Sequence, residues 1–191
     1  MSDFDGSDVA EEVEERLRET NWLAAFVLGA GAFVVGLLLT AILVVGVGES
    51  PQGGLQGVVL LVGFAFYAAN LVRIDIGDGI LVDFFAGVSN TSVPLEVYYA
   101  VPMVVLLAAG FLVVDRYATR SVDPIGTAMQ VAGIAVGYLA VALLGTFVFV
   151  TPTVTGGSAS LVVTDVLLFG LAFPLVFATL GAAIATVREV L

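Results

Sequence analysis

The sequence predicts an all-α fold: an integral membrane bundle of about five transmembrane helices, preceded by a short acidic helix. Of the 191 residues, 60% are hydrophobic and the mean hydropathy is +1.11, whereas soluble domains are roughly 45–50% apolar. The apolar residues fall into five long runs without Asp, Glu, Lys or Arg. A helix needs about 20 such residues to cross a bilayer. Because a segment in lipid must pair its own backbone groups, these runs favour helices.

Residues 1–21 form a separate acidic segment that contains eight Asp and Glu residues. Asp8 and Glu11 have the spacing of a capping box, and apolar residues follow them at helical intervals. The segment has neither the basic start nor the small-residue cleavage site of a signal peptide. We therefore predict an acidic N-terminal helix that leads into the first span. A docking helix for a partner is the second interpretation.

Residues 22–191 form one transmembrane domain, because the connections are too short for a separate soluble domain. The predicted spans are residues 22–47, 55–72, 98–114, 129–150 and 166–187. Ion-coupled pumps and voltage sensors carry ionisable residues inside their spans. The uncharged spans of this chain therefore argue against both classes of protein.

The connection 73–97 is the longest, and it combines apolar residues with several acidic and turn-forming ones. Its apolar stretch 80–88 is too short to cross a bilayer, so we expect a re-entrant or interfacial segment. Long connections in compact proteins often carry function. Asp75, Asp78 and Asp83 resemble oxygen ligands for Ca²⁺ or Mg²⁺, but their spacing matches no complete ion-binding loop. No metal site is therefore predicted.

The residue inventory excludes most catalytic and cofactor chemistry. The chain contains no Cys and no His, which removes disulfides, thiolate catalysis, the common zinc sites and Ser-His pairs. It also contains no Lys, which removes Schiff bases. We therefore predict no enzymatic activity and no cofactor.

The charge balance is strongly acidic, with 17 acidic residues, six basic residues and a net charge of −11. All six basic residues are Arg. An acid-rich, lysine-free composition is typical of a salt-rich cytoplasm, where salt screens the repulsion between carboxylates. We infer a halophilic source. Nucleic acid is excluded as a partner because its phosphates require a basic surface.

The arginines do not decide the orientation of a five-span protein, because three would lie on each side of the membrane. One side would hold Arg16, Arg18 and Arg73, and the other Arg116, Arg120 and Arg188. We expect the loop with Arg116 and Arg120 to be cytoplasmic, since the connection 151–165 lacks a positive charge. The triplet Asn90-Thr91-Ser92 agrees, because glycosylation of Asn90 requires the outer face. This orientation places the N-terminus outside.

Two faces of small residues predict close packing between helices. Gly133 and Gly137 form a G-x-x-x-G pair in the fourth span. One face of the fifth span is narrowed by Gly170, Pro174, Ala178 and Ala182. Packing inside the bundle is the favoured interpretation, and a contact face for a second copy or a partner helix is the alternative.

Residues 59–67 in the second span are similar to residues 166–174 in the fifth, with six of nine positions identical. An inverted duplication of helical hairpins, as in several transporter folds, would produce such a pair. Chance is the favoured explanation, because the spans use so few residue types.

Tyr67 and Asn70 are the neutral polar pair that we single out as a candidate site. Three residues apart, they share a helix face, where they would line a polar cavity or bond across the bundle. Their motif, residues 66–70, together with 137–140 and 173–177, resembles an uncharacterised family of haloarchaeal membrane proteins with about five spans. The resemblance implies a multi-pass protein of the cell membrane, and it implies no activity.

These observations predict a non-enzymatic membrane protein, either a structural or a partner-binding subunit. Its partners would be the lipid bilayer and either a second copy or another membrane subunit. The alternative is a small transporter or channel that works as an oligomer, which the Tyr67/Asn70 pair and the internal similarity favour.

Overall fold

The structure, a computed structural model, describes residues 21–46, 54–77, 79–87, 93–117, 124–152 and 158–190. These residues are mostly helical, as the sequence predicts. They contain the helices α2 (Trp22–Gly46), α3 (Gly54–Ala69), α4 (Leu95–Tyr117), α5 (Pro124–Val148) and α6 (Val163–Val190). A 3₁₀ turn, η1 (Phe85–Gly87), and four short strands complete them. The predicted N-terminal helix lies outside the described residues.

Four of the described helices, α2, α4, α5 and α6, are long and apolar enough to cross a membrane. The sequence predicts five spans, and the difference lies at α3. This helix has 16 residues, so it is about 24 Å long at 1.5 Å per residue. A bilayer has a hydrocarbon core of about 30 Å.

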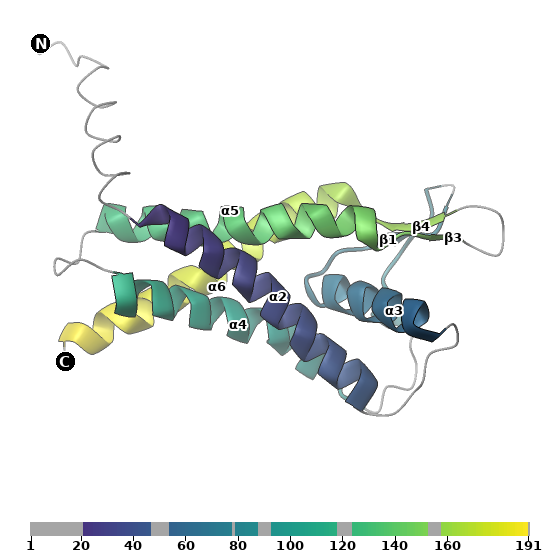
Figure 1. Ribbon diagram of the computed structural model, residues 1–191, viewed down its shortest axis with the longest axis horizontal. Helices are drawn as coiled ribbons and strands as arrows, with labels where there is room; N and C mark the ends of the chain where they lie inside the picture. The colour runs from purple at the N-terminus through teal and green to yellow at the C-terminus, as the bar shows by residue number, and fades with distance from the viewer. Residues whose placement is uncertain are drawn as a thin grey trace, which may run out of the picture.

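The four long helices lie side by side along the longest axis of the molecule (Figure 1). α2 packs against α4 and α5, and α6 packs against the same two helices. At one end α2 begins, α4 ends, α5 begins and α6 ends, and we call the adjoining part of the bundle the terminal half. All four strands lie at the opposite end, beside what we call the sheet half (Figure 1).

The long helices extend beyond the predicted spans at most ends. Pro124 opens α5 five residues before the predicted span, because proline has a helical φ and the first helical position needs no N–H donor. The residues of α4 that lie outside the predicted span include Glu96 at its start and Asp115 and Arg116 at its end. Charged residues at these ends stay outside an apolar segment while the helix itself continues.

α3 inserts its C-terminal part into the sheet half of the bundle. Its first residues are exposed or half-buried, whereas every residue from Val62 to Asn70 is buried. Leu71 then adopts a left-handed conformation with a φ of 63°. The amide of Val72 donates to the Tyr67 carbonyl and offsets this strain. After α3 the chain runs to the strands, so it returns to the end of the bundle at which α2 ends (Figure 1).

The four strands form one small antiparallel sheet in the order β2-β1-β4-β3. They are β1 (Ile74–Asp75), β2 (Leu81–Val82), β3 (Thr151–Pro152) and β4 (Ser158–Leu161). Ile74 pairs with Val82 and with Leu161, so the segment after α3 is tied to the segment before α6. The described part of the predicted re-entrant loop 73–97 therefore forms β1, β2, η1 and the start of α4.

Candidate functional site

The predicted pair on α3 meets α5 in a small set of buried hydrogen bonds. The Tyr138 hydroxyl donates to Asn70 Oδ1 at 2.8 Å, and the Tyr67 hydroxyl donates to the Ala142 carbonyl at 2.5 Å. Asn70 Nδ2 donates to the Phe66 carbonyl at 2.9 Å. We call Tyr67, Asn70 and Tyr138 the Tyr–Asn–Tyr group. The structure thus brings both sequence-predicted residues together with Tyr138. The spacing of Tyr67 and Asn70 did not predict this third residue.

The Tyr–Asn–Tyr group is buried and enclosed by aromatic rings. Tyr67, Asn70 and Tyr138 are 2%, 4% and 2% exposed. The ring of Phe33 on α2 meets the rings of Phe66, Tyr67 and Tyr138 edge-on, with centroids 5.0, 5.8 and 5.2 Å away. A buried polar group without a partner destabilises by about 1–3 kcal/mol. The three hydrogen bonds avoid this cost, and the two that involve Tyr67 and Tyr138 connect α3 to α5 and fix its position.

Glycines provide the space that these aromatic side chains occupy. A Cβ at Gly36 would lie 2.7 Å from the Phe66 ring, and one at Gly145 would overlap the Tyr67 hydroxyl. A Cβ at Gly63 would overlap the Phe149 ring. α3 can therefore insert because glycines lie opposite its own large rings and opposite the ring of Phe149, which follows α5.

A void with a volume of about 10 Å³ lies beside the group, between Phe33, Tyr67, Asn70, Tyr138 and Gly170. One water molecule needs roughly 10–15 Å³ of such space. The candidate polar cavity is therefore the size of a single water, and the polar side chains around it are already paired.

Arg73 and Asp165 form a second polar contact, close to the point where α3 returns to the sheet. Arg73 Nε and Nη2 lie 2.7 and 2.9 Å from the two Asp165 oxygens, and the Arg73 amide adds a bond of 3.2 Å. The Asp165 side chain is 7% exposed and the Arg73 side chain 51%. The hydrogen bond from Arg73 to Asp165 raises the pKa of the guanidinium, which therefore stays charged.

Sequence reasoning missed this ion pair, because Arg73 was considered only for its side of the membrane. The two residues are 92 positions apart. The available signal was that Arg73 is the single basic residue between residues 19 and 115 and that an acid, Asp165, opens the last helix.

The predicted packing residues lie inside the chain's own bundle. A Cβ at Gly133 would come within 2.9 Å of the Ala25 Cβ, and one at Gly137 would overlap the Phe26 backbone. Gly170 lies against Leu139. Pro174, Ala178 and Ala182 are fully buried or nearly so.

The acidic loop does not gather into a metal site in the part of the chain that the structure describes. Asp75 Oδ1 accepts the Gly77 amide and Asp83 Oδ1 accepts the Phe85 amide, each at 2.9 Å, so both carboxylates stabilise local turns. Asp78 and the glycosylation candidate Asn90 lie outside the described residues.

A family of unknown function, DUF7978, matches residues 6–189, so the chain belongs to this family. The match agrees with the predicted resemblance to an uncharacterised family. No similar curated protein and no similar solved structure was found.

Proposed function

We propose that this member of DUF7978 is a non-enzymatic integral protein of the cell membrane that serves as a structural or partner-binding subunit. One observation carries the proposal: the C-terminal part of α3 fills the sheet half of the bundle. Val62 to Asn70 are all buried, and the polar side chains of the Tyr–Asn–Tyr group bond to neighbouring helices. A transporter would instead need such groups to line a wetted path.

The placement in the membrane that fits the structure has four spans, α2, α4, α5 and α6, with α3 as a re-entrant helix. α2 ends, α3 begins and β1 follows α3 at the sheet end (Figure 1). A helix at membrane depth that does not cross is tolerated where protein covers its backbone. The complete burial of Val62 to Asn70 meets this condition.

Four spans change how the arginines are distributed. By their positions in the sequence, five of the six arginines then lie next to the ends of the spans at the terminal half of the bundle. The sixth, Arg73, lies next to the ends at the sheet half. The five are Arg16, Arg18, Arg116, Arg120 and Arg188. Because basic residues accumulate in cytoplasmic loops, the terminal end is cytoplasmic in this proposal. The loop with Arg116 and Arg120 stays cytoplasmic as the sequence predicts, and the N-terminus moves to the cytoplasmic side.

The orientation agrees with the remaining sequence signals. Asn90 and the connection 151–165 both fall on the sheet side, which is then the outer side. The acid-rich, lysine-free composition supports a salt-rich cytoplasm and a halophilic source, and the resemblance to a haloarchaeal family favours an archaeal one.

Single cysteines test this placement directly, because the natural chain contains none. Ser50→Cys and Ile80→Cys flank α3, and Ala118→Cys lies between α4 and α5. We expect an impermeant thiol reagent to label the first two positions in intact cells and the third only after lysis. Opposite labelling of Ser50→Cys and Ile80→Cys would show that α3 crosses the membrane.

The proposed role is tested with a double variant, Tyr67→Phe with Asn70→Leu, in the purified protein and in reconstituted vesicles at high salt. We expect a loss of about 1–2 kcal/mol in stability, because interhelical hydrogen bonds disappear. We expect no solute flux with either the wild type or the variant. Tyr99→Phe is the control, since Tyr99 contacts the Phe85 ring without joining the Tyr–Asn–Tyr group. Flux in the wild type that the variant abolishes at normal stability would establish a transporter instead.

A further inference from the structure

The small sheet has two edge strands, β2 and β3, and the register shows which backbone groups each of them presents. In an antiparallel pair, residues that exchange hydrogen bonds alternate with residues whose backbone groups point away from the partner strand. The Ile76 amide donates to the Ile80 carbonyl at 3.1 Å, which makes this a hydrogen-bonded pair. The next such pair is Ile74 with Val82, two residues further along. Leu81 lies between them, so its N–H and C=O point out of the β2 edge.

The same alternation gives the groups at the β3 edge. β4 bonds to β1 through Ser160 and Val162, since the Val162 amide donates to the Arg73 carbonyl at 3.1 Å. Ala159 therefore points the other way, toward β3, with which it pairs. The residue of β3 that follows the partner of Ala159 is Pro152, so its backbone nitrogen points out of the edge. Proline has no N–H.

The two edges of the sheet thus differ in one hydrogen-bond donor. A proline at an edge protects the strand from pairing with another chain, and β3 has this protection. β2 presents Leu81 instead, whose backbone N–H and C=O have no partner among the residues that the structure describes. The Leu81 side chain is 43% exposed. The chemistry of the β2 edge therefore fits an extended peptide, which offers a carbonyl and an amide at the matching spacing.

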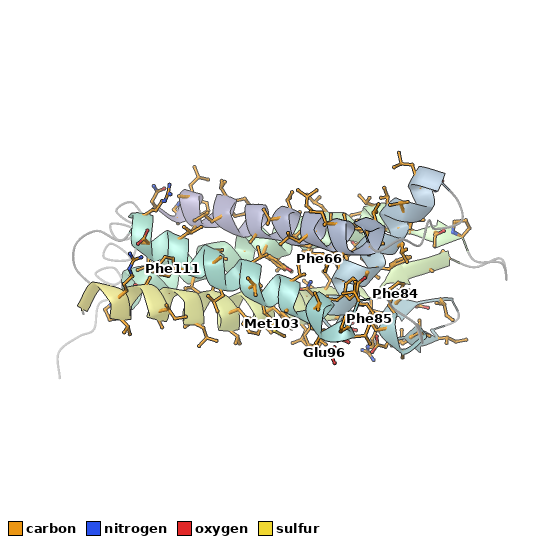
Figure 2. All side chains as sticks on the ribbon, turned by 90° about the horizontal axis from the view of Figure 1, so that it is seen from below. Phe66, Phe84, Phe85, Glu96, Met103 and Phe111 are labelled. Carbon is orange, nitrogen blue, oxygen red and sulfur yellow. The ribbon has the colours of Figure 1, made fainter. Side chains whose placement is uncertain are left out.

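An apolar groove of about 650 Å³ lies beside the β2 edge, between α3 and the sheet. Val82 of β2 and its cross-strand partner Ile74 line it, together with Phe64 of α3 and with Phe84, which Figure 2 labels at this end. Directly opposite residues of paired strands have their side chains on the same face. In a strand added to β2, the side chain opposite Val82 would therefore point toward the groove.

A second copy of this chain does not fit the β2 edge. Two β2 strands would pair symmetrically only as antiparallel neighbours, about a two-fold axis at right angles to the strands. β4, with which β1 and β3 pair, runs along the long axis of the bundle (Figures 1 and 2). Such an axis would turn one bundle upside down relative to the other. Copies of one membrane protein share an orientation, so the added strand comes from a different protein.

We propose that the β2 edge binds an extended segment of a different protein, which joins the four-stranded sheet as an additional strand. Its backbone bonds to the N–H and C=O of Leu81, and one of its apolar side chains enters the groove beside Val82. The edge strand has two residues, so backbone bonds are few and apolar burial in the groove adds to the affinity. Neither contact involves a charge, so salt does not screen it. The inference rests on the proposed partner-binding role and names the class of partner.

Photo-crosslinking of the full chain in the membranes of its native host tests the proposal. A benzoylphenylalanine replaces Ile80, which is 55% exposed and adjacent to Leu81. The control position is Ala128 on an exposed face of α5. We expect the first position to give an adduct with one other protein that the control position does not give. Mass spectrometry should locate the crosslinked residues in one short segment of that protein.

Two pairs of variants, each combined with the photoreactive residue, separate the backbone contact from the groove contact. Leu81→Pro removes the outward donor and should reduce the adduct about tenfold. Leu81→Val keeps the N–H and should retain the adduct. Ala86→Trp fills the groove from an exposed position and should reduce the adduct to a similar extent. Val97→Trp, which is exposed but does not line the groove, should retain it.

The melting temperature of each variant shows whether it folds. If Leu81→Pro lowers it, Ala86→Trp decides the test, because Ala86 is exposed and leaves the strand intact. An adduct that folded Leu81→Pro and Ala86→Trp variants leave unchanged would overturn the proposal, as would the absence of a protein adduct. An adduct of two copies of this chain would assign the edge to self-association. The thiol labelling and the stability of the double variant do not involve this edge, so they test the proposed function separately.

Discussion

The two halves of the bundle use glycine in different ways. In the terminal half, Gly29 and Gly137 lie against backbone atoms of Ile134 and Phe26, and Gly110 and Gly181 lie against those of Ala178 and Leu107. In the sheet half, glycines face side chains instead. Gly36 faces Phe66, Gly63 faces Phe149, Gly145 faces Tyr67 and Gly170 faces Leu139.

The difference follows from what lies between the helices. Direct contact of backbones lets two helices approach closely, which is a main source of stability in lipid, where the hydrophobic effect between helices is weak. In the sheet half α2 runs away from α5, and α3 lies at the opened side (Figure 1). Aromatic rings and two hydrogen bonds between α3 and α5 then replace backbone contact. The terminal half should therefore tolerate added side-chain volume less well than the sheet half.

The largest effect is expected for Gly137→Leu in the terminal half. A leucine there overlaps the Phe26 backbone, which cannot move without separating α2 from α5. We expect a loss of about 3 kcal/mol or more, measured as melting temperature and yield in detergent. Val136→Leu, at the adjacent exposed position, should behave as the wild type. Equal behaviour of both variants would show that this face is not a packing face.

Asp165→Asn should weaken the sheet half alone. The variant removes the charge from a carboxylate that receives three hydrogen bonds from Arg73, and bonds to charged groups contribute about 1.5–3 kcal/mol. We expect faster proteolysis between residues 54 and 82, with the terminal half unaffected. Asp115→Asn is the control, because its contact with Arg188 spans 3.9 Å between exposed side chains. Equal protease sensitivity of the two variants would contradict a role for the Arg73–Asp165 pair.

Gly145→Ala should displace α3 without separating the long helices. The added methyl group meets the Tyr67 hydroxyl, which belongs to the buried C-terminal part of α3. We expect a loss of about 1–2 kcal/mol, together with increased hydrogen exchange in α3. Gly31→Ala on α2 is the control, since no atom lies within 4 Å of its added Cβ. A uniform increase in exchange across all helices would mean that the two halves are not separable.

The smallest effect is expected for the hydrogen bond between Tyr138 and Asn70. A double-mutant cycle with Tyr138→Phe and Asn70→Leu should give a coupling of about 0.6 kcal/mol, at most about 1.7, as for other hydrogen bonds in membrane bundles. The measurement is equilibrium unfolding in mixed micelles. A coupling energy of zero would mean that this hydrogen bond does not help to hold α3 in place and that its aromatic contacts do so instead.

The sequence by itself determined the class of the protein and much of its helix content. Hydropathy is a local property, so the long apolar runs and their charged borders place α2, α4, α5 and α6 within a few residues. The spacing of Gly133 and Gly137 likewise indicated a close contact before any partner helix was known. The absence of Cys, His and Lys restricted the chemistry without reference to the fold.

The tertiary structure alone decided where α3 lies. The hydropathy of an apolar segment is the same whether lipid or protein surrounds it. The sequence alone therefore could not distinguish residues 55–72 from a transmembrane span. The similarity of residues 59–67 to 166–174 likewise did not indicate their surroundings, since the first segment lies in the inserted helix α3 and the second in the long helix α6. The partners of Tyr67, Asn70 and Arg73 are 75, 68 and 92 residues away. Contacts at such separations depend on how the helices assemble, and no local pattern encodes them.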